Sequence, residues 1–135
     1  MQISKKNTRQ FRVATEIKKA ISEFLLNNSI VDNYFIDSSM ISLTEVLLSP
    51  CLQHAKVFAV SLAEISNSDA RIYGAISSED CVFFLERHAQ KIRRYVGATI
   101  HLRYIPDFKF FVDNTSRQAE KIEQLIKRLP SMSQI

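Results

Sequence analysis

The stretch ISLTEVLLSPCLQHAKVFAVSL, residues 41–62, decides the fold class of this chain. Residues 41–48 and 55–62 are rich in large apolar side chains, which is typical of strands. Ser49-Pro50 interrupts the run, and a connection of about six residues favours an antiparallel arrangement of the two strands. The centre of the chain is therefore predicted to form an antiparallel strand pair.

Helical patterns flank this strand pair on both sides. Residues 8–28 carry apolar side chains at spacings of three and four, which predicts one amphipathic helix with a buried stripe. A second helical region is expected to begin at Ser77 or Ser78 and to stop at Gly97. The buried stripe of the first helix is expected to contain Phe11, Ala14, Ile17, Ile21, Phe24 and Leu25.

The C-terminal part of the chain adds one extended segment and one helix. The extended segment is expected over residues 99–113, with Pro106 at an edge or bulge position. Thr115 and Gln118 have the spacing of a capping box, and a helix over residues 116–129 follows. The order α-β-β-α(α)-β-α predicts a small α+β layer fold with three strands and segregated helices. The buried residues of the last helix are expected to be Ala119, Ile122, Leu125, Ile126 and Leu129.

Composition excludes several classes of protein. The chain has 135 residues and is 46% hydrophobic, which suits one globular domain with a substantial core. Its two cysteines, Cys51 and Cys81, are too few for a disulfide scaffold and suit a reducing cytosol. No apolar run approaches the roughly 20 residues of a membrane span, and the N-terminus lacks the apolar stretch of a secretory signal. We therefore expect a cytoplasmic protein that does not associate with membranes.

Charge is strongly segregated along the chain, although the net charge is only +4. Residues 1–20 carry six basic side chains against one acidic, and residues 87–103 carry five basic side chains and no acidic one. Residues 21–86 carry two basic side chains against nine acidic ones. If the two basic blocks meet in space, they form a positive face that attracts polyanions such as nucleic acid. The alternative is that these lysines and arginines only keep a small protein soluble.

A search for catalytic and metal-binding motifs finds none. The sequence contains no Gly-rich phosphate loop, nucleophile elbow or zinc-protease motif. Cys51 and His54 have ligand-like spacing, but a zinc site needs three or four ligands, and Cys81 and His88 could complete it only through the fold. We expect no catalytic residue, no bound metal and no cofactor.

The segment Phe108-Lys109-Phe110-Phe111 has two interpretations. Exposed aromatic rings beside a lysine can stack on nucleic-acid bases. Strand alternation, however, places Phe108 and Phe110 on one face of a sheet and Phe111 on the other. At least one of these two sets therefore belongs to the hydrophobic core.

Four groups of short motifs follow one another over about residues 9–126. The last group, Leu102-Arg103-Tyr104-Ile105-Pro106-Asp107-Phe108 followed by Phe110 and Asp113, is the most diagnostic. The other three are Arg12-Val13-Ala14 with Glu16-Ile17; Thr44-Glu45-Val46 with Ser49, Leu52 and Ala55-Lys56-Val57; and Ile92-Arg93. In this order and spacing, the set resembles the ribosome-binding factor A family of bacterial small-subunit maturation factors.

The resemblance implies a type II KH-like fold of class α+β. Its order is α-β-β-α-(kink)-α-β, with a three-stranded sheet, helices packed on one face and an additional C-terminal helix. It implies a single RNA-binding domain over residues 1–130, with a core at about residues 8–128. A short tail over residues 131–135 is expected to be disordered.

The chain departs from the family pattern at three places. The family's Ala-x-Gly kink between the central helices falls on His88 and Gln90. The Asp-Pro-Arg turn after the first helix reads Asp32-Asn33-Tyr34, and Cys51 replaces an aspartate before Leu52. These changes affect the kink and the first loop, whereas the strands and the stretch from Arg103 to Asp113 follow the pattern.

The resemblance also implies a function. Members of the family bind the free 30S subunit and assist late processing and folding of 16S rRNA near its 5′ end, especially in the cold, without catalysis. We therefore expect a monomeric assembly factor that contacts the 30S subunit and 16S rRNA, alone or with another factor such as a ribosome-associated GTPase. The alternatives are another KH-like RNA-binding protein that acts on mRNA or small RNA, and a protein-interaction module.

Basic side chains of the first and central helices are the candidate rRNA contacts, through phosphate and shape rather than base reading. Arg93 and Arg103 could instead fix a helix or a strand to a carboxylate. The candidate contacts are Lys5, Lys6, Arg9, Arg12, Arg87, Lys91, Arg93, Arg94 and Arg103.

Overall fold

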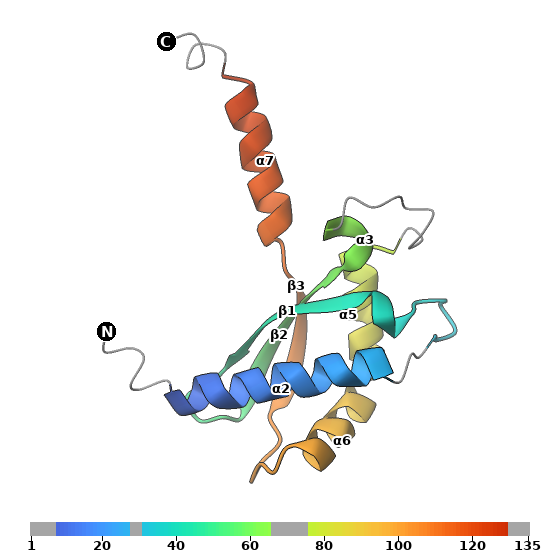
Figure 1. Cartoon of the computed structure of the whole chain (residues 1–135), viewed down its shortest axis with the longest axis vertical. Helices are drawn as coiled ribbons and strands as arrows, with labels where there is room; N and C mark the ends of the chain where they lie inside the picture. The colour runs from blue at the N-terminus through green and yellow to red at the C-terminus, as the bar shows by residue number, and fades with distance from the viewer. Residues whose placement is uncertain (1–7, 28–30, 66–75, 130–135) are drawn as a thin grey trace.

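The computed structural model describes residues 8–27, 31–65 and 76–129. Lys5, Lys6 and the expected tail over residues 131–135 lie outside these described residues. The elements follow the predicted order of helix, two strands, two central helices, strand and helix (Figure 1). In chain order they are α2 (Thr8–Asn27), the 3₁₀ turn η1 (Ser38–Met40), β1 (Ile41–Leu48), β2 (His54–Ser61), α3 (Leu62–Ile65), α5 (Ser78–Arg87), α6 (Ala89–Thr99), β3 (Asp107–Val112) and α7 (Thr115–Lys127).

The three strands form one sheet in the order β1-β2-β3. β1 and β2 pair in antiparallel orientation, as predicted, and β2 and β3 pair in parallel orientation. Successive residues of a strand point to opposite faces, and Ala55, Val57 and Ala59 of β2 are buried among the core residues of the helices. The second strand ends one residue before its predicted end, because Leu62 starts α3.

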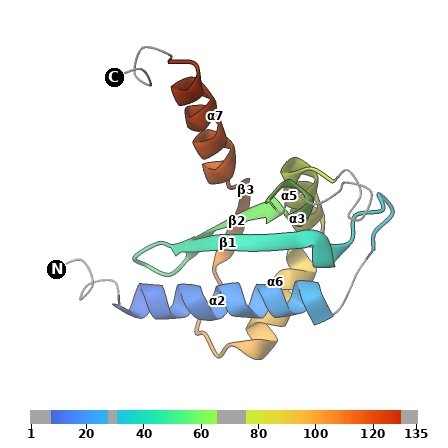
Figure 2. The same ribbon diagram turned by 45° about the horizontal axis from the view of Figure 1, so that its top comes forward.

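The helices pack on one face of the sheet, as predicted. α2 and α6 lie on the same side of the strands (Figure 2), and buried residues of α5 belong to the same core. Burial of apolar surface in this layer is the main source of stability. The three-stranded sheet, the consecutive pair α5–α6 and the one-sided packing make the fold type II KH-like. Large side chains at the centre of the layer are Ile17, Ile21, Leu25, Val57, Phe84, Leu85, Ile92 and Val96.

A kink at His88 separates the two central helices, as the resemblance implies. Ser77 caps α5: its hydroxyl accepts a hydrogen bond from the Asp80 amide at 3.1 Å, and the Asp80 carboxylate accepts one from the Ser77 amide at 3.2 Å. His88 has φ −102° and ψ 16°, so it leaves the helical range and ends α5 where Ala89 begins α6. The chain therefore keeps the kink with a histidine at this position.

The segment after the kink differs from prediction in two ways. α6 continues to Thr99, so the predicted stop at Gly97 is wrong. Gly97 instead lets the following loop approach the helix, because a Cβ atom there would overlap Cδ1 of Ile105. The extended segment predicted over residues 99–113 is too long, since only Asp107–Val112 pairs with β2. The residues before β3 form a loop that returns along α6 and α2.

The start of α2 corrects one more expectation. Phe11, predicted in the buried stripe, is 73% exposed. The observed stripe is centred on Ile17 and Ile21, which are fully buried. At 3.6 residues per turn, Phe11 is rotated by about 120° from Ile17, so its ring points away from the sheet.

The last helix is present as predicted, but its apolar face is not buried. Ile122, Leu125 and Ile126 are 56%, 53% and 62% exposed, because α7 stands away from the sheet after β3 (Figure 1). The predicted burial of the other two positions, Ala119 and Leu129, is equally wrong. Within the part of the chain that the structure describes, no helix is long and apolar enough to cross a lipid bilayer.

Hydrogen bonds fix the base of α7. Asp113 accepts from the Thr115 amide at 2.9 Å and from the Thr44 hydroxyl of β1 at 2.6 Å. These bonds replace the predicted capping box of Thr115 and Gln118, in which Thr115 would itself precede the helix. Arg117 donates to Glu64 at 2.6 Å and to both oxygens of Glu79 at 2.7 and 2.9 Å. The hydrogen bonds from Arg117 lower the pKa of Glu79 from 4.5 to about 2.

Candidate nucleic-acid interface

Seven of the nine predicted contact residues lie within the described part of the chain, all on the helical side of the molecule. Their environments divide them into two groups. One group is exposed and has no ion-pair partner among the described residues, whereas the other is engaged in contacts that hold elements together. The exposed group consists of Arg9, Arg12, Lys91, Arg94 and Arg103.

The fold brings Arg9 and Arg103 together from the two basic blocks. Both line a cavity of about 210 Å³ between the first turns of α2, the β1–β2 connection and the loop before β3. Leu52 and Leu102 contribute to its wall, and Tyr104 stands at it with 66% of its surface exposed. Guanidinium groups are planar donors that match phosphate, so this cavity is the candidate site for an anion.

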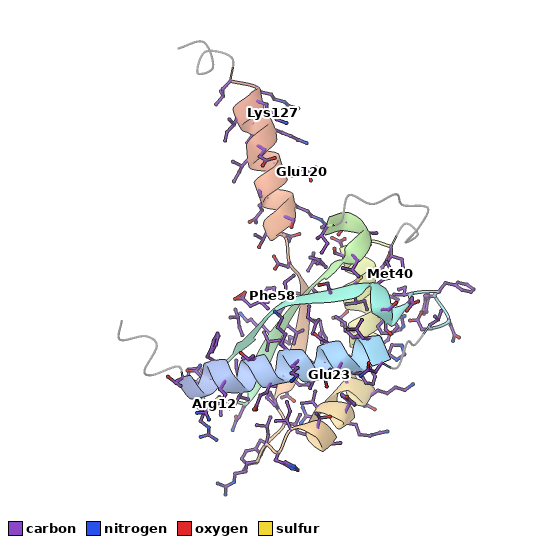
Figure 3. The ribbon with its side chains drawn as sticks, viewed as in Figure 1. Arg12, Glu23, Met40, Phe58, Glu120 and Lys127 are labelled. Atoms are coloured by element: carbon purple, nitrogen blue, oxygen red, sulfur yellow. The ribbon has the colours of Figure 1, made fainter. Side chains whose placement is uncertain are left out.

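The other exposed cations extend this positive surface. Arg12 points from α2 away from the sheet (Figure 3). Lys91 and Arg94 are exposed on α6 at a spacing of three, so they lie on one face of that helix. Long, unpaired cationic side chains on rigid helices suit contacts to the backbone phosphates of folded RNA.

Arg93 has the structural role that the sequence left open as an alternative. Its Nη1 donates to the Pro106 carbonyl at 2.6 Å and to Asp107 Oδ1 at 3.2 Å. The guanidinium therefore joins α6 to the first residues of β3 and holds the end of the intervening loop. Arg103 makes no such contact with a described carboxylate.

Arg87 is also engaged within the protein. Its guanidinium pairs with Asp32 and lies 4.3 Å from the ring centre of Tyr34 and 4.1 Å from that of Phe83. Asp32 in turn accepts hydrogen bonds from the Tyr34 amide at 3.0 Å and the Ile36 amide at 3.2 Å. Arg87 thus fastens the turn after α2 onto α5 by charge pairing and cation–π contact.

The kink residue His88 lies among charged and aromatic neighbours, with its Nε2 3.7 Å from Asp32 Oδ2. Burial, together with the nearby charges of Lys91 and Arg87, lowers the pKa of its imidazole. Its ring packs against Phe84, with ring centres 4.3 Å apart. The kink is therefore held by packing of a largely buried imidazole against α5.

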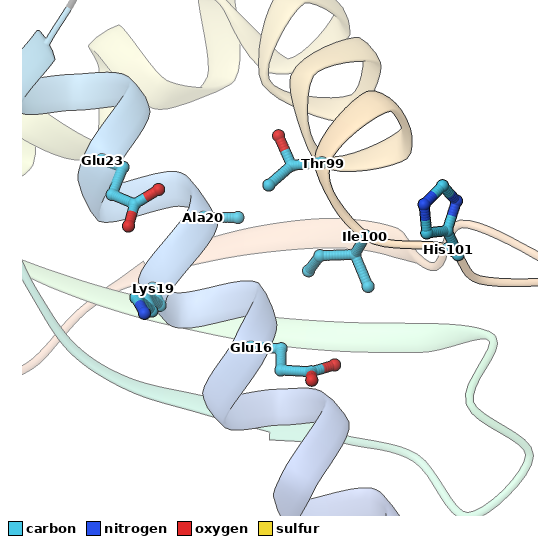
Figure 4. Close-up of a pocket in the computed structure, with 7 residues that line it drawn as sticks. All are labelled: Glu16, Lys19, Ala20, Glu23, Thr99, Ile100 and His101. Carbon is cyan, nitrogen blue, oxygen red and sulfur yellow. The ribbon is translucent and has the colours of Figure 1, made fainter.

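Acidic groups interrupt the positive surface at one groove. A cavity of about 440 Å³ lies between α2 and the end of α6. Glu16, Lys19 and Glu23 line its α2 side, opposite Thr99 and His101 (Figure 4). Two carboxylates beside one lysine disfavour phosphate here. The exposed cations are thus divided between the Arg9–Arg103 cavity and the outer face of α6.

A further cavity of about 380 Å³ lies where the kink meets β3. Its lining includes Ala89 from the kink and Phe108, Lys109 and Phe111 from β3. Phe110 is buried and Phe108 is partly buried against the core, while Phe111 is exposed on the opposite face, as strand alternation predicts. Lys109 at this cavity and Tyr104 at the Arg9–Arg103 cavity are not among the predicted rRNA contacts. In the sequence, Tyr104 is marked only by following the candidate Arg103, and Lys109 only by lying within the aromatic segment that is a candidate for base stacking.

The described residues include no cluster of three or more histidine, cysteine or acidic side chains that could hold a metal ion. Cys51 is exposed in the β1–β2 connection, whereas Cys81 is buried in α5. A hydrogen bond with Ser49 lowers the pKa of the Cys51 thiol, and burial raises the pKa of Cys81 to about 12. The two thiols therefore occupy different environments and share no site.

Comparisons with known proteins identify relatives of this chain in sequence and in fold. A family model described as ribosome-binding factor A matches residues 9–126. Ribosome-binding factor A from Mesorhizobium japonicum is 30% identical over 125 residues, which cover 92% of this chain and 77% of that protein. The protein of the same name from Phenylobacterium zucineum is 31% identical over 117 residues, covering 87% and 72%. The crystal structure of ribosome-binding factor A from Thermus thermophilus has a TM-score of 0.55 at 13% identity, covering 75% of this chain and 92% of that one. At that identity the structural likeness supports the fold alone.

Proposed function

This chain belongs to the ribosome-binding factor A family, and on that premise we propose that it binds the free 30S ribosomal subunit and assists late processing of 16S rRNA near its 5′ end. It does so without catalysis, as a monomer in the cytoplasm. Its partners are the 30S subunit and 16S rRNA, and a further assembly factor such as a ribosome-associated GTPase can act beside it.

The observation that carries the proposal is the convergence of Arg9 and Arg103 at one cavity. These residues come from the two basic blocks, which the acidic middle of the sequence separates, and neither guanidinium has an ion-pair partner among the described residues. Each phosphate that they neutralise releases counterions, which favours binding and makes it dependent on salt. Lys91 and Arg94 provide a second set of cations for the same RNA.

The roles of the predicted contacts are therefore unequal. We assign phosphate contact to Arg9, Arg12, Lys91, Arg94 and Arg103, with Lys5 and Lys6 as additions from the N-terminal segment. Arg87 and Arg93 support this surface indirectly, because they position the turn after α2 and the start of β3. Binding would then rest on charge and shape, as is usual for proteins that recognise structured RNA.

Co-sedimentation with purified 30S, 50S and 70S particles at low and moderate salt tests the proposal. We expect the protein to pellet with 30S particles alone and to be released as salt increases. The double variant Arg9→Glu/Arg103→Glu should weaken binding and reduce the dependence of log K on log salt by roughly 0.7–0.9 for each phosphate that is no longer neutralised. Lys91→Glu/Arg94→Glu should act in the same direction.

A matched control carries the same change of charge elsewhere. Lys121→Glu/Lys127→Glu reverses two exposed lysines of α7 and should leave most of the binding intact. Equal binding to all three particles, or equal loss from all three double variants, would contradict a specific positive surface. Preference for unstructured RNA over the subunit would favour a general RNA-binding protein, and binding that ignores salt would favour a protein-interaction module.

A further inference from the structure

The face of the sheet that the helices leave open carries an ordered pattern of side chains. In β2 and β3 the alternation that buries Val57 and Phe110 turns Lys56, Phe58, Lys109 and Phe111 to the other side. The parallel register places each like pair side by side, Lys56 with Lys109 and Phe58 with Phe111. Figure 3 shows Phe58 on the side of the sheet away from α2.

The two phenylalanines form an aromatic platform. Their ring centres are 5.6 Å apart with an angle of 30° between the ring planes, and Phe111 is 38% exposed. Apolar rings of this size are ordinarily buried, because each hides a large area from water. Their position on the open face leaves aromatic surface available to a flat, apolar ligand group.

The two lysines lie in the next row of the same face. Neighbouring strands are about 4.8 Å apart, so the two side chains leave the sheet next to each other. Both are exposed, and neither pairs with an acidic side chain among the described residues. Two like charges side by side on neighbouring strands repel each other and destabilise the sheet. An anion bound between the two lysines would reduce this repulsion.

The remaining ionisable groups of this face do not neutralise the lysines. Asp107 and His54 occupy the row beyond them, and Asp107 is paired with Arg93. Asp113 lies beyond the phenylalanines and accepts hydrogen bonds from two threonines. Glu45 of β1 is opposite Phe58, not opposite the lysine row. The face therefore offers a positive row next to an aromatic row.

We infer that this face binds a segment of single-stranded RNA, with bases stacked on Phe58 and Phe111 and backbone phosphates against Lys56 and Lys109. Stacking on exposed aromatic rings beside a cationic track is how sequence-tolerant single-strand binding is achieved. The inference extends the proposed function by giving the sheet its own RNA contact, separate from the phosphate contacts of the helices.

Two features favour RNA over a protein or α7 as the occupant. A purely apolar surface would cover the rings but leave the paired lysine charges uncompensated. The helix α7 carries Glu120 and Glu123 but no aromatic ring, whereas RNA supplies both aromatic bases and phosphates. The platform is also continuous with the cavity at the kink, where Lys109 and Phe111 lie together with Ala89 and with one carboxylate, Glu86. A strand of RNA can pass from that cavity across the edge of β3 onto the open face.

Fluorescence anisotropy with a fluorescein-labelled single-stranded oligoadenylate of about ten nucleotides tests the inference. Phe58→Leu/Phe111→Leu keeps apolar side chains on the sheet but removes the aromatic rings, and should weaken binding about tenfold. Lys56→Gln/Lys109→Gln should reduce the salt slope by about 1.4, which is twice the single-strand value per phosphate. Oligoadenylate paired with oligouridylate should lose the dependence on the two rings.

Matched controls separate the platform from exposed aromatic and basic residues in general. Phe35→Leu removes an exposed ring outside the sheet, and Lys121→Gln/Lys127→Gln removes two exposed lysines of α7. Both controls should bind the oligonucleotide as the unaltered chain does, and circular dichroism melts confirm that each variant is folded.

The outcomes distinguish this inference from the proposed function. Failure of the unaltered chain to bind oligoadenylate, or unchanged affinity in Phe58→Leu/Phe111→Leu, would overturn the sheet-face inference even if 30S co-sedimentation succeeds. Ring-dependent oligoadenylate binding without 30S binding would uphold the inference and overturn the ribosome proposal. If the face instead binds α7 or another protein, Phe58→Leu/Phe111→Leu should weaken that contact and leave the affinity for oligoadenylate unchanged. This outcome would also overturn the inference.

Discussion

Replacing Gly97 by alanine tests how the loop before β3 is held against α6. Gly97 lies inside the helix, where alanine is more favourable than glycine by roughly 1 kcal/mol. A Cβ atom at this position would, however, overlap Cδ1 of Ile105, while Cγ1 of the same side chain would lie 3.5 Å away. Cδ1 is the far end of a flexible, half-buried side chain and can move aside, so the overpacking should cost only about 1 kcal/mol and Gly97→Ala should leave the net stability almost unchanged.

The overlap involves a single methyl group, and this permits a sharper test. Ile105→Val removes Cδ1 and should by itself destabilise the protein by about 0.5–1 kcal/mol. When Ile105→Val is already present, the new Cβ meets only an ordinary contact at 3.5 Å. Adding Gly97→Ala to that variant should therefore stabilise it by about 1 kcal/mol through helix propensity. The two substitutions should thus be coupled by about 1 kcal/mol.

Urea denaturation of the unaltered chain, the two single variants and the double variant, followed by far-ultraviolet circular dichroism, measures this coupling. A change of 1 kcal/mol corresponds to a shift of roughly 4 °C in the midpoint of a thermal melt for a domain of this size. The reasoning is refuted if Gly97→Ala changes stability equally with and without Ile105→Val. Such additivity would mean that the loop does not rest on Gly97 in solution.

Three other contacts are open to similar tests. Arg117→Met should raise the pKa of Glu79 from about 2 toward 4.5 in an NMR titration, and an unchanged titration would contradict the ion pair. The paired carboxylate stabilises the protein above its unfolded pKa, and this stabilisation is lost as pH falls through about 2, so the variant should lose less stability over that acid range. At neutral pH a thiol reagent should label Cys51 in the native protein, whereas Cys81, with its pKa raised to about 12 by burial, should react only on unfolding, and equal rates would refute this difference. Arg87→Gln should lower the free energy of unfolding by about 2–3 kcal/mol, because it leaves the buried carboxylate of Asp32 unpaired. It should not change the dependence of RNA binding on salt. Unchanged stability with a reduced salt slope would instead make Arg87 an RNA contact.

The periodicity of the sequence predicts where helices form better than it predicts what covers them. Ile17 and Ile21 are buried as expected, because β1 and α6 lie over that face of α2. Ile122 and Leu125 have the same spacing pattern on α7, yet they are exposed. A period of three and four identifies an apolar face, whereas its burial depends on a partner that local sequence does not specify. The apolar face of α7 is exposed because the chain leaves β3 in a direction that carries α7 away from the sheet.

The candidate site shows the same division between local and long-range information. The basic character of residues 87–103 is visible in the sequence, but the fate of each side chain is not. Arg87 forms an ion pair with Asp32 and packs on the rings of Tyr34 and Phe83. Asp32 lies before both central strands, so the sequence around Arg87 does not reveal this partner. Arg9 and Arg103 lie on either side of the acidic middle of the sequence and meet only because the loop before β3 returns along α2. Charge counts predict a positive face, whereas only the fold separates binding residues from structural ones.

The open sheet face depends on strand register in the same way. Alternation alone predicts that Phe111 points opposite to Phe110. It cannot predict that Phe111 meets Phe58, or that Lys109 meets Lys56, because both pairs require β3 to lie parallel to β2 in one register. A shift of one residue would place Lys56 beside Phe108 or Phe110 and Lys109 beside Val57 or Ala55, and would send the shifted side chains to the wrong face. The platform is therefore a property of strand pairing.

The two proposed RNA surfaces lie on opposite sides of one sheet, and this constrains how they can act together. A single flat RNA surface cannot contact the cations of α2 and α6 and the rings of β2 and β3 at once. Either two RNA segments enclose the domain or one segment passes around the edge of β3, where the kink cavity joins the two sides. Separate segments would make the effects of helix-side and sheet-side substitutions on 30S binding nearly additive, since distant sites without shared partners act independently. One continuous segment would make them non-additive, because removing its hold on one side frees the strand that the other side must bind. Combining Arg9→Glu/Arg103→Glu with Phe58→Leu/Phe111→Leu therefore shows whether the domain lies between two parts of the RNA or holds a single strand along both of its faces.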